Sequence, residues 1–164
     1  MHGGARAARS ELLRRYRWIL AIAVLALVIT LSWSTVASAA SASVVRHGPS
    51  DRKQIALTFD DNHNPSRAVA VLRALQRHQV RATLFVVGQS VNAYPSINSE
   101  IVKGMAAGLF EVGDHSRSHA DLTKLSNGAK AAEIGGGTDA FRKATGARTV
   151  PLFRPPYGAT NASV

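Results

Sequence analysis

The sequence predicts an α/β fold built on a parallel sheet and preceded by an N-terminal targeting segment. Two observations support this class: short apolar runs alternate with segments of helical periodicity, and polar clusters follow the apolar runs directly. The predicted order is β-α-β-α-β-α-β, a pattern of parallel strands joined by crossover helices. In such folds the chemistry gathers at the carboxyl ends of the strands.

The N-terminal segment has the pattern of a secretory signal peptide. Residues 14–17 read RRYR, residues 18–33 carry no charge, and residues 34–39 are small and end in an Ala-x-Ala pattern. A basic head, an apolar middle and a small-residue exit predict a signal peptide over residues 1–39, cleaved after Ala39. An uncleaved membrane anchor is the alternative, because about 20 apolar residues span a bilayer. Either reading exports the rest of the chain.

A polar linker, residues 40–52, is expected before a domain at residues 53–164. The first strand of this domain is predicted over 53–59, where the alternating residues Ile55, Leu57 and Phe59 share one face that is expected to be buried. Further strands are predicted at 82–87, 109–112 and 150–153.

Three helices are predicted between these strands. Asn64-Pro65-Ser66 supplies a turn and an N-cap for the first, Pro95-Ser96 opens the second, and Ser126 caps a third that Gly146 ends. Gly135-Gly136-Gly137 predicts a weak or kinked third helix, since each glycine costs about 1 kcal/mol relative to alanine.

Composition and charge exclude several classes of protein. With 46% hydrophobic and 18% charged residues, the chain is foldable rather than disordered. The net charge is +10, but five arginines concentrate part of it ahead of the first apolar run, and the rest is scattered without aromatic interleaving. This pattern argues against a nucleic-acid partner. No cysteine is present, so imidazole and carboxylate must hold any transition metal.

Three polar clusters follow predicted strands: Asp60-Asp61, His115 with His119, and Arg154-Pro155-Pro156-Tyr157. Adjacent carboxylates resist joint ionisation unless a cation lies beside them, and two imidazoles four residues apart converge on one ion from a tight turn. An arginine stiffened by prolines pairs with a carboxylate. Each cluster alone is compatible with a surface turn; together they predict a His, His, Asp metal site with positions open to water.

These clusters, in this order, resemble the motifs of the polysaccharide deacetylases with the NodB homology domain, carbohydrate esterase family four. Thr58-Phe59-Asp60-Asp61 resembles the first motif, His115-Ser116-x-x-His119 the second, and Arg154-Pro155-Pro156-Tyr157 the third. The resemblance covers roughly residues 53–164. It implies a distorted (β/α) barrel, of which this chain carries about four of seven strands.

The resemblance also implies a role for each motif residue. The residues that would bind a divalent metal, usually Zn²⁺ with Co²⁺ or Mn²⁺ as alternatives, are Asp61, His115 and His119. Asp60 would be the general base, and Arg154 would pair with it. The backbone N–H of Tyr157 would help hold the oxyanion.

The implied function is removal of acetyl groups from an N-acetylglucosamine-containing polymer, peptidoglycan or chitin-like. An esterase for O-acetyl groups on xylan stays open, because the three motifs do not separate these substrates. An inactive, exported carbohydrate- or metal-binding remnant also stays open. The family's later motifs, including a histidine that acts as general acid, have no counterpart after Tyr157, so weak or no activity is expected of this chain alone, as of a gene fragment or truncated variant. Membrane contact is expected only through the N-terminal segment.

Two residues depart from the first family motif. Asn62 stands where glycine is usual, and His63 stands where proline is common. Asparagine tolerates positive φ, so the turn is expected to form. His63 adds an imidazole near the site, which either competes for the metal or faces solvent; of the two, exposure to solvent is expected.

Overall fold

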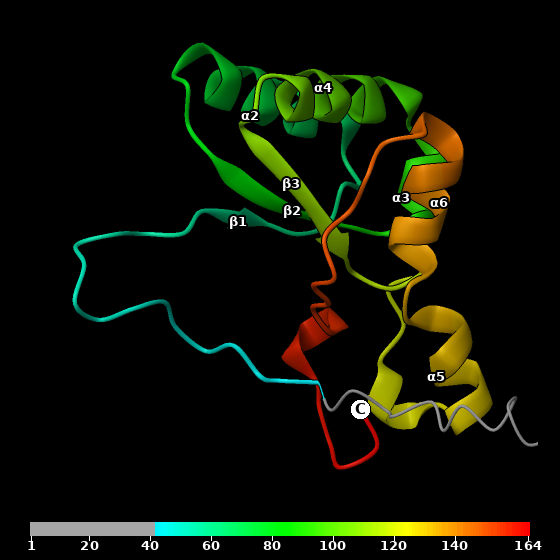
Figure 1. The fold of residues 1–164 in the computed structure, drawn as a ribbon. Coiled ribbons are helices and arrows are strands. Elements are labelled where there is room, and N and C mark those ends of the chain that lie inside the picture. The colour runs from blue at the N-terminus through cyan, green and yellow to red at the C-terminus, as the bar shows by residue number, and fades with distance from the viewer. Residues whose placement is uncertain (1–41) are drawn as a thin grey trace, which may run out of the picture. The chain divides into compact units, whose positions relative to one another are not determined.

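A three-stranded parallel sheet lies at the centre of the computed structural model, which describes residues 42–164 (Figure 1). Its strands are β1 (Thr58–Phe59), β2 (Ala82–Val86) and β3 (Phe110–Asp114), in the order β1-β2-β3. All elements belong to one unit, His47–Val164. The parallel α/β class predicted from the sequence is therefore confirmed, as a three-stranded sheet.

The predicted leader, residues 1–39, lies outside the described residues. Within 42–164, no helix combines the length and apolar character that a bilayer crossing requires.

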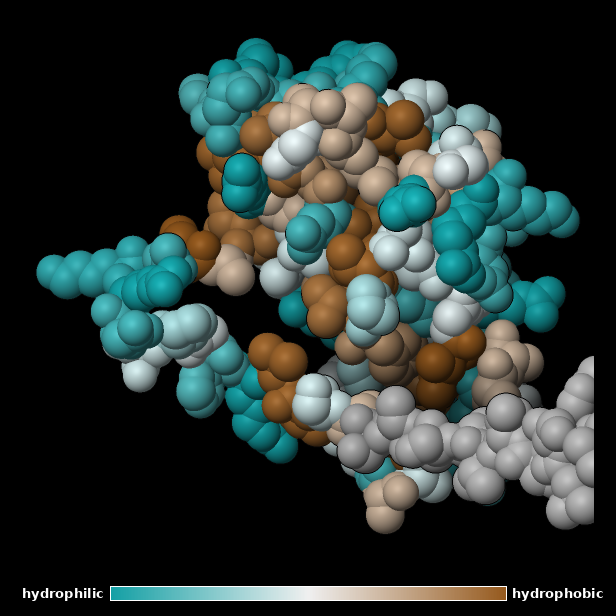
Figure 2. All heavy atoms as spheres, in the orientation of Figure 1, coloured by the Kyte–Doolittle hydropathy of each residue, from teal (hydrophilic) through white to brown (hydrophobic). Residues whose placement is uncertain are grey.

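Helices cover one face of the sheet. Alternate side chains of the strands, Leu84 and Val86 on β2 and Val112 on β3, join the buried core beneath the helices. On the surface, hydrophilic side chains gather along the upper and right-hand edges of the molecule in the view of Figure 2, and hydrophobic ones show between and below them. Phe85 points to the opposite face, where the guanidinium carbon of Arg154 lies 4.1 Å from the ring centroid. The helices are α2 (Pro65–Arg77), α3 (Gly88–Ala93), α4 (Pro95–Ala106), α5 (Asn127–Glu133) and α6 (Gly136–Thr145), with 3₁₀ turns at Leu122–Lys124 and Pro156–Gly158.

The predicted helix boundaries are largely confirmed. Asn64 caps α2 by accepting a hydrogen bond from the backbone N–H of Arg67 (3.1 Å), and Pro95 opens α4. Ser126 caps the third predicted helix, which breaks into α5 and α6 where Gly135 adopts φ 85°. The glycine run thus makes the predicted kink because it supplies a left-handed backbone position.

The first strand is shorter than predicted. The sequence predicts 53–59, but only Thr58 and Phe59 pair with β2. Ile55 is 87% exposed and Leu57 is 37% exposed, so the expected burial of this face is wrong. Alternation predicts a strand only where a neighbour covers the apolar face, and no described element covers Ile55.

The predicted fourth strand, 150–153, is reduced to a single bridge between Phe153 and Asp114. Pro151 has no N–H to give to a ladder, and the N–H of Leu152 donates to the carbonyl of Val150 at 2.8 Å, closing a tight turn. The segment still lies beside β3, because the N–H of Arg154 donates to the Asp114 carbonyl at 2.9 Å. The described residues therefore form an open sheet rather than a barrel.

A buried carboxylate joins the two outer helices. Glu100 of α4 is 5% exposed and accepts hydrogen bonds from Arg73 of α2 and Lys103, each at 3.0 Å. The hydrogen bond from Arg73, followed by that from Lys103, holds the pKa of Glu100 below its ordinary value of 4.5. The ionised form is therefore favoured by folding.

We expect Glu100→Gln to lower the free energy of unfolding by about 1–2 kcal/mol near neutral pH, because two charge-assisted hydrogen bonds are weakened. The pKa is depressed in the folded chain, so this stabilisation is present above 4.5 and is lost as pH falls through the folded value. Urea unfolding at about pH 7 and about pH 3 measures the difference. The matched variant Glu111→Gln, at an exposed site, should not change the free energy of unfolding at either pH. An equal loss of stability in both variants would contradict the stabilising role of Glu100.

Candidate metal centre

The candidate site lies at the carboxyl ends of β1 and β3. Asp60 and Asp61 follow β1 directly, and His115 follows β3. Four of the five non-glycine residues with positive φ in the described part of the chain are motif residues: Asp61, Ser116, His119 and Tyr157. Strained backbone of this kind persists only where the surroundings hold it, and it concentrates at functional sites.

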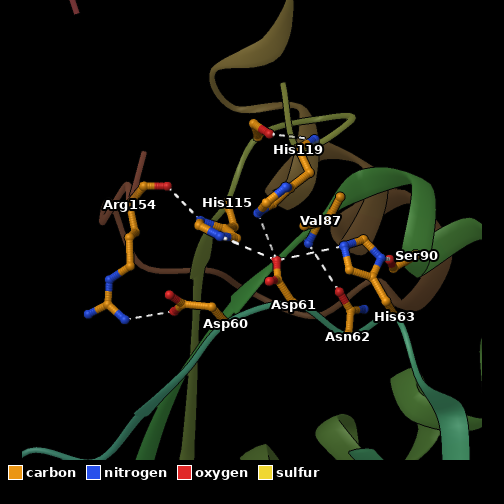
Figure 3. Close-up of polar contacts among 10 residues, drawn as sticks. Asp60, Asp61, Asn62, His63, Val87, Ser90, His115, His119 and Arg154 are labelled. Atoms are coloured by element: carbon orange, nitrogen blue, oxygen red, sulfur yellow. Dashed lines mark hydrogen bonds and ion pairs between the residues drawn. The ribbon is translucent and has the colours of Figure 1, made fainter. Parts of the chain in front are cut away.

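One oxygen atom of Asp61 faces three imidazoles (Figure 3). Its Oδ1 lies 3.0 Å from Nε2 of His119, 3.4 Å from Nε2 of His115 and 3.7 Å from Nε2 of His63. Bonds of about 2.0–2.1 Å to a tetrahedral ion would place neighbouring donor atoms about 3.3 Å apart. Both predicted histidine ligands therefore lie close to Asp61, and a nitrogen and oxygen donor set at this spacing fits a divalent transition metal. The three residues whose donor atoms all lie within 4.8 Å of one another are, however, Asp61, His63 and His119, a group that does not include His115.

His115 is fixed in one tautomer by its second nitrogen. The ring is buried, and Nδ1 lies 2.7 Å from the backbone carbonyl oxygen of Arg154. A carbonyl only accepts, so Nδ1 carries a hydrogen and donates it, and Nε2 is the nitrogen that faces Asp61. Metal-binding histidines usually have this second hydrogen bond.

Asp60 faces away from the imidazoles and pairs with Arg154. The Nη1 group of Arg154 donates to Asp60 Oδ1 at 2.6 Å and to the hydroxyl of Thr58 at 3.0 Å. Phe85 supports the guanidinium from the sheet. The predicted pairing of Asp60 with Arg154 is therefore present as a contact. Because of it, Asp60 has a guanidinium as its neighbour, whereas Asp61 has imidazoles.

Tyr157 covers the other side of His119. Its ring centroid lies 4.7 Å from that of His119, at an angle of 69°, and the residue is 73% exposed. The predicted oxyanion role of its backbone N–H stays a prediction.

The departures from the first motif behave differently from expectation. Positive φ falls at Asp61 rather than at Asn62, whose buried side chain instead accepts a hydrogen bond from the N–H of Val87 at 3.2 Å. The side chain of His63 is 51% exposed, as expected, but it is not free of contacts: its Nδ1 lies 2.7 Å from the hydroxyl of Ser90, and its Nε2 lies 3.7 Å from Oδ1 of Asp61. Ser90 lies on α3, a helix that the sequence did not predict, so no sequence pattern indicated Ser90 as a partner of His63.

Behind the two histidines, helix α6 holds the loop in place. Buried Asp114 accepts hydrogen bonds from the backbone N–H groups of Gly135 (2.7 Å) and Thr138 (3.0 Å), and Glu133 accepts from the N–H and hydroxyl of Ser118. A Cβ atom at Gly137 would lie 2.1 Å from the carbonyl oxygen of Val86. The glycine run predicted only a kink; these supports could not be predicted from the sequence, because their partners come from distant segments.

We expect Gly137→Ala to destabilise the chain by about 1–3 kcal/mol, because backbone rather than a flexible side chain would meet the new methyl group. Gly128→Ala is the matched control, since a Cβ there meets no atom within 4 Å. It should be neutral or stabilising by about 0.5–1 kcal/mol. Thermal unfolding measures both; a tolerated Gly137→Ala would show that this close approach does not hold the loop.

The chain belongs to the polysaccharide deacetylase family, whose model matches residues 47–164. The predicted resemblance to carbohydrate esterase family four is thereby confirmed, and it is supported by solved structures of that family.

Several relatives act on peptidoglycan by name. The chain is 40% identical over 111 residues to the peptidoglycan-N-acetylmuramic acid deacetylase PdaC of Bacillus subtilis and 41% identical over 113 residues to the peptidoglycan-N-acetylglucosamine deacetylase PgdA of Listeria monocytogenes. Each match covers 68% of this chain and 23% of the relative, so the chain spans about a quarter of these proteins.

Solved structures include both an enzyme and a pseudoenzyme. The Bacillus subtilis PdaC structure matches with a TM-score of 0.57 and 39% identity, covering 65% of this chain and 50% of that one. A family-four pseudoenzyme from Bacillus anthracis matches with a TM-score of 0.61 and 26% identity, covering 69% and 38%. Family membership alone therefore does not establish turnover.

Proposed function

We propose that this chain is a metal-dependent hydrolase that removes acetyl groups from peptidoglycan outside the cytoplasmic membrane. The observation that carries the proposal is the convergence of three imidazole Nε2 atoms on Oδ1 of Asp61. The relatives named as peptidoglycan deacetylases supply the substrate class, and the signal-like residues 1–39 supply the compartment.

The proposed ligands of the ion are Asp61, His115 and His119. A divalent metal held there would lower the pKa of a bound water and polarise the carbonyl of the acetyl group. His115 contributes a fixed lone pair, because the Arg154 carbonyl binds the hydrogen on its other nitrogen. Imidazole and carboxylate ligands of this kind suit Zn²⁺ or Co²⁺. Which of the two ions is bound depends on the availability of each metal as well as on the affinity of the site.

Asp60 is the proposed general base. The guanidinium of Arg154 donates a 2.6 Å hydrogen bond to Oδ1 of Asp60 and keeps this carboxylate oriented, so that it can accept a proton from the attacking water. Asp61, whose Oδ1 faces the imidazoles, is committed to the ion. The two adjacent carboxylates thereby take different roles through different partners.

We expect substitutions of these two carboxylates to have separable effects. Asp61→Ala should abolish zinc binding and acetate release together, because it removes the shared ligand. Asp60→Ala should retain zinc binding and lower turnover about 10²- to 10⁴-fold, as loss of a general base does. Competition with a chromophoric chelator measures binding, and Asp139→Ala, at an exposed position on α6, is the control. Zinc binding that survives Asp61→Ala would contradict the proposed ligand set.

The substrate is tested by acetate release from peptidoglycan fragments, an N-acetylglucosamine oligomer and acetylated xylan. We expect zinc-dependent release from the first two at a low rate, since the proposed site lies on an open sheet rather than inside a closed barrel. Preferential release from acetylated xylan would favour the esterase alternative, with which a bifunctional xylanase/deacetylase relative, 36% identical over 111 residues, is compatible. Zinc binding without release from any polymer would favour the inactive remnant.

A further inference from the structure

The half-exposed His63 makes two contacts that parallel those of the buried His115. In both residues Nδ1 makes a 2.7 Å hydrogen bond, to the Ser90 hydroxyl in one case and to the Arg154 carbonyl in the other. In both residues Nε2 faces Oδ1 of Asp61, at 3.7 Å and 3.4 Å (Figure 3). The Ser90 hydroxyl can donate or accept, so Nε2 of His63 offers a lone pair when Nδ1 donates its hydrogen to Ser90. In that tautomer His63 has the arrangement of a metal-binding histidine, with an outer partner on one nitrogen and a lone pair on the other.

The anchor of His63 is rigid although its ring is accessible. Ser90 is 3% exposed within α3, so its hydroxyl holds a fixed position. The imidazole itself is half exposed and has no hydrophobic reason to adopt one orientation. Its hydrogen bond to Ser90 therefore sets the direction in which Nε2 points.

The spacing of the donor atoms allows His63 to share an ion with Asp61 and His119. Donor atoms of Asp61, His63 and His119 all lie within 4.8 Å of one another. The 3.7 Å separation of His63 Nε2 from Asp61 Oδ1 exceeds the tetrahedral spacing of about 3.3 Å by only a few tenths of an ångström, which a rotation of a half-exposed ring provides. The competing explanation is a simple contact between histidine and aspartate.

We propose that His63 is a fourth protein ligand of the ion, positioned by Ser90 and added to Asp61, His115 and His119. This inference rests on the proposed function, because it assumes that those three residues bind the ion. Four protein donors close a tetrahedral centre, whereas a hydrolytic centre keeps one position for water. His63 thus strengthens metal binding and competes with water for the coordination position that hydrolysis needs.

The test compares four forms of the full chain: wild type, His63→Ala, Ser90→Ala and His78→Ala. His78 is the matched control, because it is an exposed histidine at the far end of α2. Zinc affinity is measured by competition with a chromophoric chelator, and the visible absorption of bound Co²⁺ reports exchange of a nitrogen ligand for water. We expect His63→Ala to weaken zinc binding about 100-fold and Ser90→Ala about 10-fold, with a changed Co²⁺ spectrum in both. His78→Ala should match wild type.

Acetate release at saturating zinc gives a further readout, and we expect it to rise in His63→Ala, because water gains the vacated position. Wild-type affinity and spectrum in His63→Ala, with binding still abolished by Asp61→Ala, would overturn this inference and leave the proposed function intact. Wild-type protein that binds no zinc through Asp61 would overturn both. Circular dichroism of each variant establishes that the fold is retained.

Discussion

The side-chain oxygen Oδ1 of Asp61 is the point on which the site depends. Three ring nitrogens face it within 3.7 Å, although their residues come from two separate loops. Without a cation between them, neutral imidazole lone pairs and a carboxylate oxygen present electron density to one another. A positive ion, or hydrogens on the imidazoles, is what makes such an arrangement favourable. The proposed cation site rests on this geometry.

The fold brings these groups together through backbone constraints rather than through a large enclosing core. Parallel pairing aligns the ends of β1 and β3 on either side of β2, so that Asp61 and His115 leave the sheet at the same edge. Positive φ at Asp61 and at His119 then turns both side chains inward. The hydrogen bonds from the α6 N-terminus to buried Asp114 hold the loop that makes the second turn possible.

Much of this site was predictable from the sequence because its residues follow local rules. Asp60-Asp61 and His115 each follow an apolar run, which predicted that their side chains would lie at the same edge of the sheet. The helix caps were predicted from proline, serine and glycine. What the sequence did not predict depends on contacts between distant segments. The length of β1 depends on what covers Ile55, the fourth strand fails through Pro151 and a local turn, and the orientation of His63 requires Ser90 on an unpredicted helix.

Asp60 and Asp61 illustrate how neighbours in sequence become different in chemistry. Asp60 accepts a hydrogen bond from Arg154, whereas Asp61 faces imidazoles, and the proposed roles of base and ligand rest on this difference in surroundings. X-ray absorption at the zinc edge of the loaded chain tests the shared ion most directly. Nitrogen and oxygen donors at about 2.0–2.1 Å with imidazole scattering, lost in Asp61→Asn, are the expected result. A spectrum of hydrated zinc without imidazole would contradict a metal centre at Asp61.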